Sequence, residues 1–421
     1  MKNHYIPLLL IFLSLPMQAQ NDEVTVNQGE MKVDSGTEVS TYFDFTNASS
    51  GSVFNDGSIH FYGDYTNEGL FTYTTNSRMG YVVFEGKNKA IQTLSGKSPS
   101  FFYDALFNKS GSNYSFHLKN EIENSGTVNL TDGIVLMDKE AGGAFIFLKG
   151  ATHVNTKDIS HVRGEVTKIG NESFKYPIGD SGYYRYASIS APANVADTYT
   201  GEYLFKNSDI NYPHRNKTGV LQTINDKEYW IVNQGDTTNK SVILTLSWDA
   251  RTTPANLIAN GAKDLHIVRW DEKQSLWVDE GGIVDYANQT VTSPVAVEGF
   301  GIFTLANIKA ELSNPGDVVI YDGVTPDGDG LNDYFIIDNI QQFPNNTVRI
   351  FNRWGVEVFK TSNYDSNGNV FRGYSEARAT VQSGEKLPTG TYYYVLEYEY
   401  NRNGESRMIK KAGFLHLESN N

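Results

Sequence analysis

The feature that most restricts the fold is a series of short strand-like runs separated by Asn-x-Gly turns in the first third of the chain. The runs include residues 58–62 (SIHFY), 81–84 (YVVF) and 127–130 (TVNL). The turns are Asn55-Asp56-Gly57, Asn67-Glu68-Gly69 and Asn124-Ser125-Gly126. Asn and Gly both tolerate the positive φ of sharp turns, and this spacing suits either a hairpin ladder or short rungs of a β-solenoid. We therefore predict an all-β chain whose residues 20–159 form a solenoid-like or ladder region.

A second β region is predicted over residues 160–308. Residues 242–248 (VILTLSW) alternate, with Val242, Leu244, Leu246 and Trp248 on one face, which is the period of a half-buried strand. Residues 265–270 and 275–278 flank a hairpin-like connection. This spacing predicts an Ig-like β-sandwich middle domain. Residues 309–317 then read as a linker.

The last hundred residues carry an ordered set of motifs. They are residues 323–333 (GVTPDGDGLND), 348–355 (VRIFNRWG), 387–396 (LPTGTYYYVL) and 411–415 (KAGFL). This set resembles the gliding motility-associated C-terminal domain, the type B sorting domain of the type IX secretion system of Bacteroidetes. The regions before it resemble β-rich modules of bacterial surface proteins. The resemblance implies a C-terminal β-sandwich sorting domain over residues 318–421, and a type IX machinery that binds it.

Bulk composition restricts the partners and the compartment. The net charge of −14 argues against a nucleic-acid partner, since phosphate binding needs clustered Lys and Arg. The chain has no Cys, which excludes disulfides and thiolate metal sites. Lys2, His4 and the apolar run of residues 6–17 indicate a secretory signal peptide over residues 1–19, with Gln20 as the mature N-terminus. No later stretch is apolar enough to span a bilayer, so we expect no membrane span in the mature chain.

One loop is a candidate metal site. Its oxygen-bearing side chains are those of Asp327, Asp329, Asn332 and Asp333. Calcium prefers several hard oxygen ligands, and the interspersed glycines let a backbone fold around an ion, so these four residues form a candidate calcium site. The pattern is not that of an EF-hand, and the alternative is a set of Asx turns without metal.

Other suggestive patterns favour structural roles. Residues 179–182 (GDSG) are similar to a serine-protease loop, but no histidine lies in a matching context, which favours a turn. Residues 387–390 favour a turn into a strand over a sortase signal. Four tryptophans of the middle region could form a glycan platform, but we expect them in a sandwich core. They are Trp230, Trp248, Trp270 and Trp277.

The function predicted from the sequence is that of an exported, adhesin-like or structural protein at the outer-membrane cell surface or released to the medium. Residues 318–421 would address it to the type IX machinery, and the upstream regions would bind a glycan or another surface partner. No catalytic constellation is found, so no enzyme activity is assigned. The alternative is a secreted glycan-binding module or carbohydrate-active enzyme with the same sorting domain. A basic group near the C-terminus is either a solvated hairpin end or a contact for the secretion machinery. It comprises Arg402, Arg407, Lys410 and Lys411.

Overall fold

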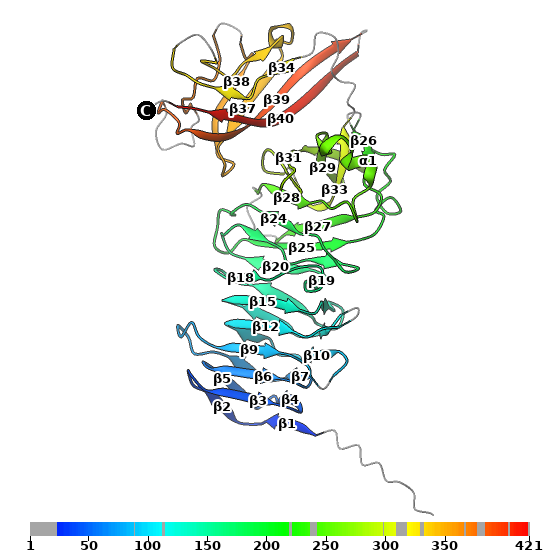
Figure 1. Ribbon diagram of the computed structural model, residues 1–421, viewed down its shortest axis with the longest axis vertical. Coiled ribbons are helices and arrows are strands. Elements are labelled where there is room, and N and C mark those ends of the chain that lie inside the picture. Colours follow the sequence, from blue (N-terminus) through cyan, green and yellow to red (C-terminus); the bar gives the residue numbers. More distant parts are fainter. Residues whose placement is uncertain are drawn as a thin grey trace, which may run out of the picture.

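The computed structural model is an elongated stack of β-structure (Figure 1). It describes residues 23–87, 89–111, 114–218, 221–235, 242–297, 299–308, 318–328, 332–365, 368–376, 384–402 and 405–419. The predicted signal peptide and the predicted linker lie outside these ranges. The first rungs lie at one end of the stack and the C-terminal domain at the other (Figure 1).

The N-terminal region is a β-solenoid in which each complete rung contributes one strand to each of three parallel sheets. Sheet A comprises β1 (Val24–Asn27), β4 (Asp44–Asn47), β7 (Tyr65–Asn67), β10 (Gln92–Ser95), β13 (Phe116–Leu118), β16 (Val135–Met137) and β19 (Val162–Arg163). The parallel part of sheet B comprises β2 (Glu30–Val33), β5 (Ser52–Asn55), β8 (Leu70–Thr72), β11 (Ser100–Phe102), β14 (Glu121–Asn124), β17 (Ala144–Phe147) and β20 (Val166–Ile169). Sheet C comprises β3 (Glu38–Thr41), β6 (Ser58–Phe61), β9 (Tyr81–Phe84), β12 (Asp104–Asn108), β15 (Thr127–Asp132) and β18 (Thr152–Val154). This confirms the solenoid form of the prediction.

Alternation along these short strands creates the solenoid core. Strands such as β5 and β6 bury every second residue, because successive side chains on a strand point to opposite faces. The inward positions hold an aromatic column in which Phe84 contacts Phe61 and Phe107, with ring centroids 5.5 and 5.2 Å apart. Each ring thus packs against rings of neighbouring rungs.

The Asn-x-Gly turns lie at the corners of rungs, but the predicted reason for them is wrong. Neither Asn67 nor Gly69 has positive φ. Asn67 is buried and its amide donates to the backbone oxygens of Ser98 and Pro99 in the next rung. A Cβ on Gly69 would lie 2.2 Å from the carbonyl oxygen of Gly51. These turns therefore select Asn for a bond between rungs and Gly for the close approach of two backbones.

Asparagines also stack along one corner of the first three rungs. Asn27 Nδ2 donates to Asn47 Oδ1 over 2.9 Å, and Asn47 Nδ2 donates to Asn67 Oδ1 over 2.8 Å. Each pair is separated by twenty residues, which is the length of one rung here. The ladder satisfies buried amides that would otherwise be costly to desolvate.

The middle region continues the solenoid. Sheet B extends through antiparallel strands β25 (Thr198–Leu204), β27 (Tyr229–Gln234), β33 (Gly301–Ile308), β29 (Leu265–Asp271) and β30 (Leu276–Gly281), with β26 (Leu221–Ile224) paired to β33. Sheet D comprises β21 (Phe174–Lys175), β24 (Ala187–Ile189), β28 (Leu244–Ser247), β32 (Thr290–Thr292) and β31 (Ile283–Asp285). The smaller elements are β22 (Gly179–Asp180), β23 (Tyr183–Tyr184), the single-turn α1 (Ala255–Ile258) and the 3₁₀ turn η1 (Ala259–Ala262). One hydrophobic cluster includes Val33 of the first rung and Leu305 of β33, so solenoid and middle region share a core. The Ig-like topology stays a prediction.

A buried ion pair joins the two sheets of the middle region. Arg185 Nε lies 3.2 Å from Glu228 Oε2, and both side chains are almost completely buried. Glu228 also accepts hydrogen bonds from Tyr203 and Thr253, while Arg185 donates to the carbonyl oxygen of Ser247. Because its hydrogen bonds are satisfied inside the core, this network is structural.

The C-terminal domain has its own core around sheet E. Sheet E comprises β35 (Gly323–Val324), β40 (Glu405–Leu417), β39 (Gly390–Arg402), β37 (Asn346–Phe351) and β38 (Glu357–Ser362). The other elements are β34 (Val319–Ile320), β36 (Ile337–Asp338) and the 3₁₀ turn η3 (Ile340–Gln342). The tyrosine-rich face of β39 is buried, because alternate residues of a strand point to the same side. No helix in the described ranges is long and apolar enough to cross a membrane.

Candidate functional site

Among the described residues of the C-terminal domain, the most exposed large hydrophobic side chain lies at the tip of the β37–β38 hairpin. Asn352 organises the tip, because its Oδ1 accepts hydrogen bonds from the backbone N–H groups of Trp354 and Val356, each over 3.0 Å. Gly355 has φ +76°, a conformation that L side chains rarely adopt, which closes the turn. The turn holds Trp354 outward with 66% of its surface exposed.

Arginine accompanies this tryptophan. The guanidinium carbon of Arg353 lies 4.1 Å from the centroid of the Trp354 ring, which is a cation–π arrangement. Trp and Arg are the residue types that most often dominate protein–protein binding energies. An exposed pair on a rigid turn is therefore suited to insertion into a pocket of a partner. Both residues belong to the motif of residues 348–355, but no binding role was predicted for them; a Trp between Asn and Gly at a hairpin turn is the signal that could have indicated one.

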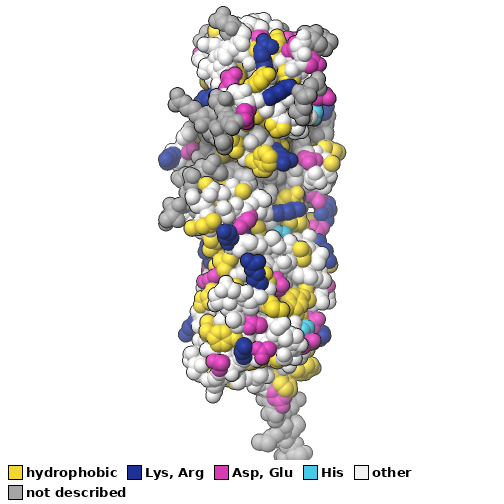
Figure 2. All heavy atoms as spheres, turned by 90° about the vertical axis from the view of Figure 1, so that its left-hand side faces the viewer, with side chains coloured by type: hydrophobic (Ala, Val, Ile, Leu, Met, Phe, Trp, Pro, Cys, Tyr) yellow, Lys and Arg dark blue, Asp and Glu magenta, His cyan; other side chains and the backbone are white. Residues whose placement is uncertain are grey.

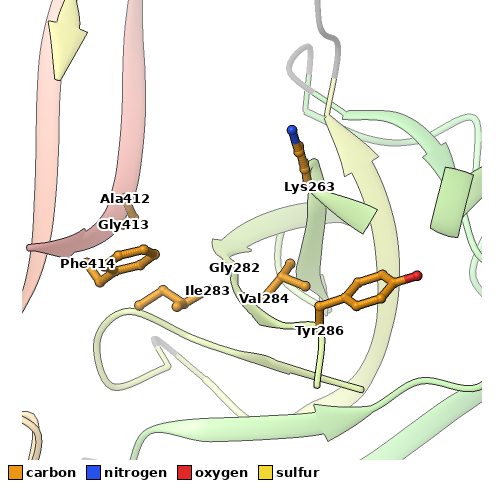
Figure 3. A pocket seen from close by; sticks show the side chains of 8 residues that line it. All are labelled: Lys263, Gly282, Ile283, Val284, Tyr286, Ala412, Gly413 and Phe414. Atoms are coloured by element: carbon orange, nitrogen blue, oxygen red, sulfur yellow. The ribbon is translucent and has the colours of Figure 1, made fainter. Parts of the chain in front are cut away.

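A hollow of about 510 Å³ separates the C-terminal domain from the middle region. Phe414 of β40 faces Ile283 of β31 across it, whereas Tyr286 points away (Figure 3). Half of the Phe414 surface is exposed. The two parts approach each other again at Gly355, where an added Cβ would lie 2.5 Å from Ile243 Cδ1 of the middle region.

A charged group also lies near this junction. Burial opposes ionisation of Asp279, but His266, whose Nδ1 lies 2.8 Å away, and the nearby charge of Lys410 hold the pKa of Asp279 below its usual value. Lys410 belongs to the basic group noted in the sequence. The side chains of Arg402 and Arg407 lie outside the described residues, so the proposed role of the whole group stays a prediction.

The predicted calcium loop is held by its own hydrogen bonds. Asp333 Oδ1 accepts from the backbone N–H of Gly328 over 2.6 Å, and Thr325 N–H donates to the carbonyl oxygen of Asn332 over 2.7 Å. Asn332 has φ +55°, and Asp327 N–H donates to the carbonyl oxygen of Thr325. Asp329 lies outside the described residues. The described part of the loop is therefore closed by its own side-chain and backbone hydrogen bonds. Calcium binding by Asp327, Asp329, Asn332 and Asp333 and the alternative of Asx turns both stay predictions.

The other suggestive motifs have structural positions. Ser181 and Gly182 form the two-residue turn between β22 and β23, both with positive φ. Thr389 leads into β39 and accepts from the N–H of Ser419 through its Oγ1. The four tryptophans of the middle region are each at most 6% exposed, as expected for a core. They are therefore not a glycan platform.

Taken together, the motifs of residues 318–417 form one compact β-domain at the end of an all-β stalk. Those residues match the family model described as the CHU_C type IX secretion signal domain. The C-terminal domain is thus a type IX secretion signal domain, and it indicates a protein exported by that system, to the cell surface or beyond, through interaction with its machinery. No curated protein and no solved structure matches the chain.

Proposed function

We propose that this chain is an adhesin-like or structural protein of the cell exterior, in which a β-stalk is displayed by its type IX sorting domain. The observation that carries the proposal is the position of that domain at one end of an extended stack, opposite the first solenoid rung (Figure 1). Export through this end leaves the rungs free to project from the surface.

The surface of the stack supports a binding role. Figure 2 shows one long face on which basic, acidic and hydrophobic side chains of the described residues are interspersed among uncharged polar groups and backbone. A mixed surface of this kind offers many small contacts along its length instead of one deep reaction site. Within the described ranges, no group of three or more His, Asp or Glu side chains is arranged to hold a metal ion. We assign no bond chemistry.

We further assign the contact with the secretion machinery to the β37–β38 hairpin tip. Trp354 is exposed, Arg353 stacks on its ring, and the turn holds both in place, so the pair can be buried against a partner. Gly355 of the same tip lies against Ile243 of the middle region, whereas Trp354 is exposed. The machinery would therefore bind the side of the tip that carries Trp354.

The experiment compares two chains in a host with an active type IX system, the full chain and one that lacks residues 318–421. Each carries the same reporter after residue 308 and the same N-terminal signal. The full chain should react with an external antibody on intact cells or be recovered from the medium, and the shortened chain should stay in the periplasm. Equal external signal from both chains would refute the proposal for the sorting domain.

The adhesin role needs its own readout. Cells that lack the gene and express the full chain should attach to a surface or to each other more than cells that express a chain with residues 23–169 removed, at equal external reporter signal. Equal attachment would separate the two parts of the proposal, leaving export intact and overturning adhesion by the solenoid.

A further inference from the structure

One corner of the solenoid carries a hollow whose lining differs from the rest of the stack. The hollow has a volume of about 520 Å³. Its lining comes from the turns that follow successive strands of sheet B and includes Tyr73, Asn76, Arg78, Tyr103, Lys149 and Glu172. The residues are far apart in sequence but form a row along the solenoid axis, because each rung contributes the same corner.

The loop of residues 73–80 forms one wall of this hollow and is held in place. Asp56 accepts hydrogen bonds from both the backbone N–H and the hydroxyl of Thr74, over 2.9 and 2.6 Å. At the other end of the loop, a Cβ on Gly80 would lie 2.2 Å from the carbonyl oxygen of Asn55. Anchoring at both ends gives the Arg78 backbone, whose φ is +46°, a defined position at the rim.

Two tyrosines belong to the lining. The rings of Tyr73 and Tyr103 meet edge to face with centroids 5.7 Å apart, and the Tyr73 hydroxyl donates to Ser125 Oγ over 2.8 Å. Tyrosines fixed in this way offer apolar ring surface together with polar edges. Parallel rungs follow one another at about 4.8 Å, which is close to the length of one sugar unit in a polysaccharide.

The charges of the hollow favour an anion. Among the described residues, neither Arg78 nor Lys149 has a carboxylate within ion-pair distance. The one carboxylate of the lining, Glu172, lies 3.2 Å from Nζ of Lys168, whose side chain is buried. Burial opposes ionisation of Glu172, but its bond to Lys168 holds its pKa below the usual value. Two cations therefore remain available on a chain of net charge −14.

The neighbouring hollow gives this site a direction. It shares Arg78 but is lined by Glu38, Asp56 and Asp104, and its volume is about 440 Å³. An anionic chain would be repelled there, so it would extend from Arg78 toward Lys149.

We propose that the hollow defined by Tyr73, Asn76, Arg78, Tyr103, Lys149 and Glu172 binds an acidic oligosaccharide, with ring faces on the tyrosines and sugar carboxylates on Arg78 and Lys149. Guanidinium and ammonium groups bind carboxylates through charge-assisted hydrogen bonds, and the hydroxyl, amide and aromatic groups complete a lining suited to sugars. The site gives the adhesin role of the solenoid a class of ligand, and in this respect it rests on the proposed function.

The test is calorimetric titration of the purified mature chain with polygalacturonate oligomers, with fully methyl-esterified oligomers of the same length as the matched ligand. The wild type should bind the acid form and not the ester. R78Q and K149Q should each weaken binding about tenfold, as loss of one charge-assisted hydrogen bond implies. Y103A should weaken it to a similar extent. Lys139, which is exposed and paired with Glu165 outside the hollow, supplies the control K139Q, which should bind like the wild type.

The outcomes separate cleanly. Because the side chains of Arg78 and Lys149 are exposed, R78Q and K149Q should fold like the wild type, which melting curves by circular dichroism check. The proposal would be overturned if the acid and the ester bound equally, or if K139Q lost as much binding as R78Q. A separate titration with inorganic sulfate tests for a simple anion site, and binding of sulfate without binding of the oligomers would also overturn the proposal. Because the titration uses purified protein and one class of ligand, its failure leaves the results of the export and attachment experiments unaffected.

Discussion

The solenoid and the sorting domain are both built from strands, but they hold together differently. In the solenoid, short parallel strands stack rung on rung, and a side chain such as Phe84 packs on rings from its own rung and from the two neighbouring rungs. In the sorting domain, β39 and β40 are each 13 residues long and pair along their whole length. Stability is thus shared among local interfaces in one region and concentrated in one hairpin and its core in the other. We therefore expect a destabilising substitution in the solenoid to act locally, whereas one in the sorting domain should affect the whole of that domain.

The largest expected effect comes from deleting one buried ring in each region. Phe84→Ala and Phe335→Ala each remove a fully buried phenyl group, which costs about 3–5 kcal/mol of folding free energy. Region-resolved hydrogen exchange should show faster exchange in β6, β9 and β12 for the solenoid variant. For the sorting-domain variant it should show faster exchange throughout β37, β39 and β40, because Phe335 packs on Tyr394 of the long hairpin.

Phe43→Ala is the control for both, since 41% of that side chain is exposed and its loss should change stability little. Exchange that rises equally over the whole solenoid in Phe84→Ala would contradict the view that its stability is local.

A smaller effect is expected from the asparagine ladder, which has no counterpart among the described strands of sheet E. Asn67→Ala removes the hydrogen bonds of Asn67 to Asn47 and to the carbonyl oxygens of Ser98 and Pro99, although Asn47 still donates to Leu70 and Ser98 still accepts from Asn120. Each lost hydrogen bond costs about 0.5–1.5 kcal/mol, so chemical denaturation should occur at lower urea concentration. Asn345→Ala, which removes an exposed bond to Glu399, should change the midpoint much less. Equal midpoints for the two variants would show that the ladder does not stabilise the solenoid more than an exposed hydrogen bond stabilises the sorting domain.

Acid should also affect the two regions differently. His161 is fully buried where the solenoid meets the middle region; its Nδ1 bonds to the Lys157 carbonyl oxygen, and its Nε2 has no partner among the described residues. Burial lowers the pKa of His161, so the unfolded chain binds the proton more readily than the folded one. This contribution is complete above about pH 6.5, the usual value for His, and is lost as the pH falls toward the folded pKa. Each unit of displacement corresponds to about 1.4 kcal/mol.

Hydrogen exchange at pH 7 and 5, corrected for the intrinsic rate, should therefore show β16, β19 and β22 losing protection before β39 and β40. His161→Phe should flatten this pH dependence, whatever its effect on stability at pH 7. An unchanged dependence in His161→Phe would exclude this histidine as the cause.

The extent to which the sequence predicted the molecule follows from how local each signal is. Alternation identified the buried face of residues 242–248, and the spacing of two short runs identified the hairpin of β29 and β30, because both signals depend only on neighbouring residues. Neither signal could show that sheet B continues from the solenoid into the middle region, since the pairing of β20 with β25 joins segments about 30 residues apart. The Asn-x-Gly turns were located correctly, but their bonds to the next rung are long-range. The lining of the corner hollow was not predicted for the same reason, as Tyr73 and Lys149 come together only when the rungs stack.

The smallest expected effect on stability is that of Trp354→Ala, and it sharpens the comparison most. Because 66% of the ring is exposed, its loss should change the free energy of unfolding by about 0.5 kcal/mol or less. If the hairpin tip contacts the secretion machinery, the exported fraction should nevertheless fall several-fold, because a central Trp often accounts for more than 2 kcal/mol of a binding free energy. Tyr374→Ala, which removes another exposed ring of the same domain, should leave export unchanged. Normal export of Trp354→Ala would show that the secretion machinery recognises a surface other than the tip. Reduced export with normal stability would show that recognition of the sorting domain depends on a surface residue, whereas the stability of the solenoid depends on buried residues.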